Sequence, residues 1–215
     1  STPKPSSAAS DVYKRQTIDN EPMRNYEPNS KDRQELQKAV DELLACKPFE
    51  IPVIIDGQEF RSGKLAKQVN PGDHAQAVCY YHEADERMVN IAIEGALKAK
   101  KRWMNMPWSE RAAISMKAAD LIAHKYRYQL LAATMVGQGK NVWQAEIDAG
   151  AEICDFLRFG VKYVDDMYQI QPPRNSPGVW NRTEYRPLEG FVLAISPFNF
   201  TAIAGNLVIC LLYTS

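Results

Sequence analysis

The sequence lacks the features by which several classes of protein are recognised. It has no polybasic run, and its 26 Lys and Arg residues balance 26 Asp and Glu residues, so no nucleic-acid partner is expected. No apolar run approaches the roughly 20 residues that span a bilayer, so we expect a soluble protein with no membrane partner. Three histidines and four scattered cysteines fit neither a metal site nor a disulfide framework, which favours a reducing compartment and no metal.

The 215 residues are enough for one or two domains with a core of their own. Residues 1–16 are rich in Ser, Pro, Ala and Lys and show no apolar period. This composition predicts an unstructured leader and not a signal peptide.

Periodic patterns predict a short β region followed by a block of helices. The Asp56-Gly57 pair predicts a hairpin turn between residues 51–55 and 59–60, and residues 69–73 predict a second turn before a strand at 77–81. Apolar residues at helical spacing predict helices over residues 32–47, over 88–103, from an N-cap at Ser109, over 127–135 with a stop at Gly137–Gly139, and over 142–167.

The last of these helices has two faces of different character. One face is apolar, whereas Asp148, Glu152, Asp155 and Phe159 form an acidic stripe with an aromatic end. Because exposed carboxylates are the commoner case, periodicity favours a solvated face. A site for an ammonium group is the alternative.

The most informative segment lies near the end of the chain. Residues 179–186 and 191–195 predict two strands, the second of them buried, and Pro197 ends that strand just before Asn199 and an apolar helix. Ligands in open α/β sheets collect beyond the carboxyl ends of strands, so an amide between Phe198 and Phe200 is expected to meet a substrate in a dry pocket. The order of elements predicts an α/β protein with antiparallel additions.

Several segments together resemble the aldehyde dehydrogenase family. Residues 189–200 are similar to the strand and loop that carry its oxyanion-hole asparagine, and residues 134–140, 144–149 and 155–159 extend a likeness that runs from about Asn20 to Leu207. The form Ser-Pro-Phe-Asn-Phe-Thr resembles the branch that oxidises L-glutamate γ-semialdehyde to L-glutamate in proline catabolism, with NAD as cofactor. The resemblance implies the N-terminal part of that fold over residues 17–208: an incomplete Rossmann-like NAD-binding domain with a helical block.

The resemblance also implies roles for single residues. Asn199 would hold the oxyanion that forms when a thiolate attacks a small-molecule aldehyde. Glu152 would lie near the substrate ammonium group, and Phe200 in the aldehyde box. The NAD groove would be lined by Ile195, Ser196, Pro197 and Phe198. Residues 179–186 would begin an oligomerisation flap, so the resemblance implies a homo-oligomer, and in animals and fungi it implies the mitochondrial matrix.

The likeness stops soon after Asn206. The family's nucleophilic Cys and general-base Glu come later than that, and Cys210 does not replace the nucleophile, because no cation that would activate a thiolate occurs from Phe191 onward. Because the family's nucleophile and general base are missing, we expect the chain by itself to be inactive. Residues 1–16 and 209–215 match nothing in the family, so we expect these two ends to be foreign. The alternatives are a dehydrogenase of another aldehyde, or a non-catalytic interaction module that pairs through Thr183–Arg186.

Overall fold

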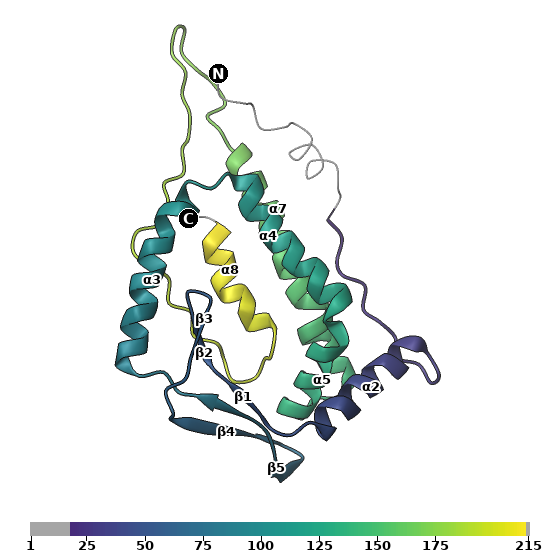
Figure 1. The fold of residues 1–215 in the computed structure, drawn as a ribbon. Helices are drawn as coiled ribbons and strands as arrows, with labels where there is room; N and C mark the ends of the chain where they lie inside the picture. The colour runs from purple at the N-terminus through teal and green to yellow at the C-terminus, as the bar shows by residue number, and fades with distance from the viewer. Residues whose placement is uncertain (1–17, 214–215) are drawn as a thin grey trace.

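The computed structural model describes residues 18–213, and their side chains through Ile209. The expected foreign leader at residues 1–16 and the side chain of Cys210 lie outside the described residues. The described chain is α/β, and its three-stranded sheet lies at one end of a group of packed helices (Figure 1).

The β region consists of one three-stranded sheet and one separate hairpin. The sheet has the order β1 (Phe49–Ile51), β5 (Asp73–His82) and β4 (Leu65–Asn70), with β1 parallel and β4 antiparallel to β5. The hairpin pairs β2 (Val53–Ile55) with β3 (Gln58–Phe60). Its turn residues Asp56 and Gly57 have φ angles of 50° and 73°, as a two-residue hairpin turn requires. Both predicted turns are therefore confirmed.

The predicted helices are present. They are α2 (Lys31–Ala45), α3 (Glu86–Met104), α4 (Trp108–Asp120) with the π-helical turn η1 (Leu121–Lys125), and α5 (Arg127–Gln138). The predicted stop after α5 is confirmed, because Gly139 adopts a left-handed conformation with φ of 65° at the helix C-cap. In the described part of the chain, no helix combines the length and the apolar character needed to cross a membrane.

One predicted helix start is wrong. The N-cap of α4 is Pro107 and not Ser109, because the Pro107 carbonyl accepts the first hydrogen bonds, from the amides of Glu110 (3.0 Å) and Arg111 (3.2 Å). Proline is suited to the start of a helix, where its missing N–H has no partner to lose. Ser109 lies inside the first turn.

The helix expected over residues 142–167 contains a π-helical segment. α6 (Val142–Ala145), η2 (Glu146–Glu152) and α7 (Ile153–Gln169) follow one another without a break. Because a π turn bonds residue i to residue i+5, side chains four positions apart no longer share one face as they do in an α-helix. The predicted solvated stripe is therefore wrong at Asp148, which is 1% exposed, whereas Glu152 is exposed.

Small side chains let these helices pack closely. Ala119 and Ala123 meet Ile153, Cys154 and Leu157 where α4 and η1 lie against α7. A second cluster joins α2 and α5 to the 142–152 region through Leu36, Leu131, Ala145 and Ala149. Four of these nine core positions are alanine, so the facing helices leave little room there for larger side chains.

The two strands predicted near the end of the chain are wrong. Residues 179–186 and 191–195 are extended but pair with no strand among the described residues, and Leu193 and Ile195 are 75% and 78% exposed. A strand needs a neighbour for its N–H and C=O groups, and an apolar pattern alone does not supply one. The helix expected after Asn199 is present as η3 (Ile203–Gly205) and α8 (Asn206–Tyr213), and α8 packs on α7 and α4.

Candidate functional site

Asn199 lies on the exposed turn between the extended segment 191–197 and η3. The flanking rings do not enclose it in the described chain, since Phe198 is 95% exposed and Phe200 is 37% exposed. A cavity of about 590 Å³ opens beside the turn, and Asn199 lines it together with Gln138 and Lys140. Asn199 thus lines an open cavity and is not enclosed in a dry pocket.

Side chains from two other elements bind the backbone of this turn. Lys140 Nζ donates to the Asn199 carbonyl at 2.6 Å, pairs with Asp148 Oδ2 at 3.3 Å and lies 4.5 Å from the centroid of the Phe200 ring. The Asp148 carboxylate accepts the backbone amides of Thr201 (2.9 Å), Ala202 (3.3 Å) and Ile203 (3.1 Å). The turn is therefore held by Asp148 of η2 and by Lys140, which lies between α5 and α6.

The other predicted site residues are placed differently. Ile195, Ser196 and Pro197 are exposed on the extended segment that leads into the turn. Glu152 is exposed at the end of η2 and has no hydrogen bond or ion pair to Asn199 or Phe200 within residues 18–209. The structure therefore brings Asn199 and Phe200 together around Lys140, and it leaves Glu152 on a neighbouring surface of the same helix as Asp148.

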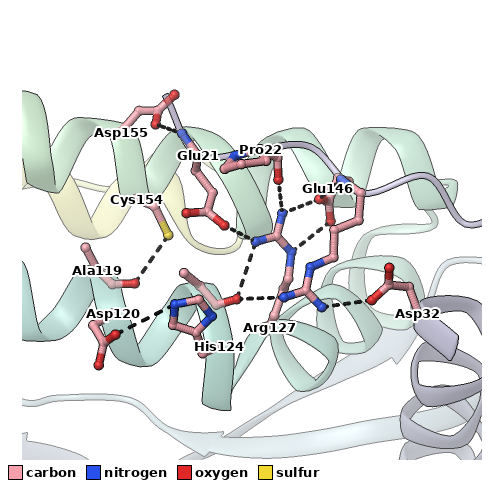
Figure 2. Close-up of polar contacts among 12 residues, drawn as sticks. Glu21, Pro22, Asp32, Ala119, Asp120, His124, Arg127, Glu146, Cys154 and Asp155 are labelled. Carbon is pink, nitrogen blue, oxygen red and sulfur yellow. Dashed lines mark hydrogen bonds and ion pairs between the residues drawn. The ribbon is translucent and has the colours of Figure 1, made fainter. Parts of the chain in front are cut away.

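A second set of buried charges surrounds Arg127, at the start of α5 (Figure 2). Arg127 and Glu146 are both fully buried, and the guanidinium pairs with both carboxylate oxygens, through Nη2 and, at 3.3 Å, through Nε. Arg127 Nη1 also donates to Glu21 at 2.6 Å, and Nη2 donates to the Pro22 carbonyl at 3.0 Å. The N-terminal segment is thereby tied to the helices.

Neighbouring polar groups complete this network. Tyr26 donates its hydroxyl to Glu146 at 2.6 Å, and Arg158 donates to Glu21 at 2.6 Å. Burial raises the pKa of Glu21, but the hydrogen bonds and charges of Arg158 and Arg127 outweigh it and hold the pKa below its usual value. Burial also lowers the pKa of Arg127, and its bonds to Glu146 and Glu21 reverse that effect and raise it. Both groups are therefore charged at neutral pH.

Two of the described cysteines, Cys79 and Cys154, do not have the properties of nucleophiles. Cys154 is fully buried, donates to the Ala119 carbonyl at 3.6 Å, and has a pKa raised by burial to about 11. Burial also raises the pKa of Cys79, and Cys46 is exposed at the end of α2. Because the thiolate is the reactive form, a raised pKa indicates a structural role for Cys79 and Cys154.

The sequence over residues 58–212 matches the model of the aldehyde dehydrogenase family. The chain belongs to this family. The expected fold class is confirmed, since the structure is α/β and superimposes on part of solved structures of the family.

Similar proteins narrow the likeness to one branch. The chain is 59% identical to a delta-1-pyrroline-5-carboxylate dehydrogenase of Agaricus bisporus over 91% of this chain and 36% of that protein. It is 46% identical to the mitochondrial delta-1-pyrroline-5-carboxylate dehydrogenase of Homo sapiens over 88% of this chain and 33% of that protein. A crystal structure of the Mycobacterium tuberculosis delta-pyrroline-5-carboxylate dehydrogenase bound with NAD superimposes with a TM-score of 0.88 at 41% identity, covering 93% of this chain and 38% of that one. The chain spans about a third of the length of these relatives.

Lys140 and the Arg127 network were not among the residues predicted for the site. The signal for Lys140 was its position directly after the helix stop at Gly139, where a cationic side chain can reach nearby carbonyls. The signal for the Arg127 network was Gly150, a glycine inside a helix and between two alanines. A Cβ atom added there would lie 2.7 Å from Glu146 Oε2 and 3.2 Å from Arg127 Nε, so the bare glycine makes room for the ion pair.

Gly150→Ala is expected to destabilise the fold. The added methyl group would displace the Glu146 carboxylate from a buried ion pair, which should lower the free energy of unfolding by roughly 3 kcal/mol. Gly95→Ala in α3 is the matched control, because its Cβ would meet only the Asp56 Cβ atom at an ordinary 3.8 Å. It should be neutral or stabilising by about 0.5–1 kcal/mol. Equal effects of the two changes in urea unfolding would contradict this account of Gly150.

Proposed function

We propose that the protein to which this chain belongs oxidises L-glutamate γ-semialdehyde, formed from Δ1-pyrroline-5-carboxylate, to L-glutamate with NAD, as a step of proline catabolism. The observation that carries the proposal is the 59% identity, over 91% of this chain, to a protein named delta-1-pyrroline-5-carboxylate dehydrogenase. The family match over residues 58–212 includes the Asn199 turn. The mitochondrial names of several relatives support a mitochondrial matrix location.

Asn199 is the residue of this chain to which we assign chemistry. When a thiolate adds to the aldehyde carbonyl, negative charge develops on the oxygen, and a neutral amide N–H aimed at that oxygen stabilises it. The geometry supports this role, since Lys140 binds the backbone carbonyl of Asn199 while Asn199 itself is exposed and lines the cavity. The nucleophile and the general base belong, by family resemblance, to sequence beyond Asn206, so we propose that the 215-residue chain alone is inactive.

The segment before Asn199 fits a dinucleotide. Ile195 and Phe198 expose apolar surface instead of burying it, and the flat rings of NAD need accessible apolar surface of this kind. We therefore assign Ile195, Ser196, Pro197 and Phe198 to the NAD groove. Bound NAD would supply the acceptor for the hydride that leaves the aldehyde carbon.

The long loop between α7 and residue 187 is the part that we assign to self-association. It runs away from the helices and returns (Figure 1), and its Trp180 and Val179 are 76% and 53% exposed. The Tyr185 hydroxyl anchors the loop by donating to the Met167 carbonyl at 3.0 Å. An exposed tryptophan on an anchored loop is suited to a partner copy of the same protein.

Asn199→Ala in the full-length protein is expected to lower kcat about 10²–10³-fold, because one oxyanion donor is lost. The measurement is NADH formation from glutamate semialdehyde by wild type and variant. Asn90→Ala, at an exposed asparagine of α3, is the control and should leave kcat unchanged. A full-length wild type that does not reduce NAD with this substrate would refute the proposed function.

Glu152→Gln is expected to separate the proposed substrate from other aldehydes. Loss of the carboxylate should raise KM for the amino-acid semialdehyde about tenfold, a free energy of about 1.4 kcal/mol, because its ammonium group loses a partner. KM for a short alkyl aldehyde should stay the same, as should both values in Glu94→Gln, an exposed glutamate of α3. A wild type that prefers the alkyl aldehyde would instead favour a dehydrogenase of another aldehyde.

Trp180→Asp is expected to shift the protein from an oligomer towards a monomer in sedimentation velocity, because it places a charge in the proposed interface. Trp143→Asp is the matched control, since Trp143 is also exposed, at 54%, but lies in α6. A wild-type protein that sediments as a monomer would count against this role of the loop.

A further inference from the structure

The turn that carries Asn199 is ordered by side chains and not by a β-sheet. Gln138 Nε2 donates to the Phe198 carbonyl at 3.4 Å, and Lys140 Nζ donates to the next carbonyl, that of Asn199. Asp148 then accepts the amides of residues 201–203. Backbone groups on both sides of Asn199 are thus held by distant residues.

The Asp148 carboxylate has an unusual position for this task. It is 1% exposed and lies 53 positions before Thr201, yet it takes the place of a local cap at the start of η3. Removing a carboxylate from water is costly, and one ion pair with Lys140 does not by itself offset that cost. The three amide bonds supply the remaining partners that a buried carboxylate needs.

Lys140 connects Asp148 to the functional residues. Its ammonium group contacts the Asp148 carboxylate, the Asn199 carbonyl and the face of the Phe200 ring. A cation over an aromatic ring is attracted to it, so Lys140 also restricts the orientation of Phe200. One side chain therefore limits the backbone freedom of Asn199 and the side-chain freedom of its neighbour.

We propose that Lys140 and Asp148 are positioning residues that aim the Asn199 amide at the reacting oxygen. This inference rests on the proposed role of Asn199 as an oxyanion donor. We assign neither residue a contact with the substrate. They fix the peptide groups next to Asn199, and a donor held in this way loses no orientation when the reaction begins. A displacement of about 1 Å in such a group can cost about a hundredfold in rate.

The first test is Lys140→Met in the full-length dehydrogenase. We expect kcat to fall about 10–100-fold, with less than a twofold change in KM for NAD, and Lys140→Arg to recover part of the loss because it restores a donor and a cation. Lys117→Met is the matched control, since Lys117 and Asp120 form an exposed pair at 3.1 Å on α4. It should leave kcat unchanged. A kcat of Lys140→Met equal to wild type, while Asn199→Ala is impaired, would overturn the inference alone.

The second test asks whether Lys140 acts through Asn199. In an Asn199→Ala background, adding Lys140→Met should lower kcat less than twofold, because no donor remains to be aimed. The same additional loss in both backgrounds would show a general structural role and overturn the proposal. If Asn199→Ala itself leaves kcat unchanged, the oxyanion role fails, and the positioning role fails with it.

A third measurement is independent of activity. Asp148→Asn should increase amide hydrogen exchange in the peptide that covers residues 198–203, whereas the exchange of β4 and β5 should stay the same. Unchanged protection of residues 198–203 would refute the hold on the turn whatever the activity of the protein. If Asp148→Asn increases the exchange of that peptide but the wild-type protein does not oxidise the semialdehyde, the proposed function is refuted, whereas the role of Asp148 in ordering the turn is supported.

Discussion

Two carboxylates only two positions apart, Glu146 and Asp148, are both buried in the π-helical segment η2, and the rest of the described structure depends on where each one is bound. Glu146 pairs with Arg127 and so holds the N-terminal segment through Glu21 and Tyr26. Asp148 pairs with Lys140 and holds the Asn199 turn. A buried charge needs partners to be stable, so the burial of these two carboxylates depends on contacts from both ends of the described chain.

This arrangement explains how an exposed turn can be well defined. The extended segment 191–197 has no strand partner among the described residues, so sheet pairing cannot order Asn199 from that side. The side chains of Gln138, Lys140 and Asp148 instead order the turn by hydrogen bonds to its backbone. The π-helical segment η2 contains both Asp148 and the exposed Glu152. One element therefore supports the proposed oxyanion donor and provides the proposed contact to the substrate ammonium group.

The sequence predicted what depends on local patterns. Helical periodicity located the helices, and the Asp56-Gly57 pair located a hairpin whose left-handed turn residues the structure confirms. The strands at 179–186 and 191–195 were wrong because a strand is made by its neighbours. Asp148 was assigned to a solvated stripe because an α-helical period was assumed, and the π segment changes that period. Arg127 forms ion pairs with Glu146, 19 positions after it, and with Glu21, 106 positions before it. No local sequence pattern predicts contacts over such separations.

A crystal structure of the full-length protein with NAD and an unreactive analogue of the semialdehyde tests the central claim most directly. We expect the Asn199 amide nitrogen to lie about 2.7–3.1 Å from the carbonyl oxygen of the analogue, the range for an oxyanion donor. We also expect Lys140 still to bind the Asn199 carbonyl and Asp148 still to accept the amides of residues 201–203. An Asn199 amide directed away from that oxygen, or a turn released by Asp148 and Lys140, would contradict this claim.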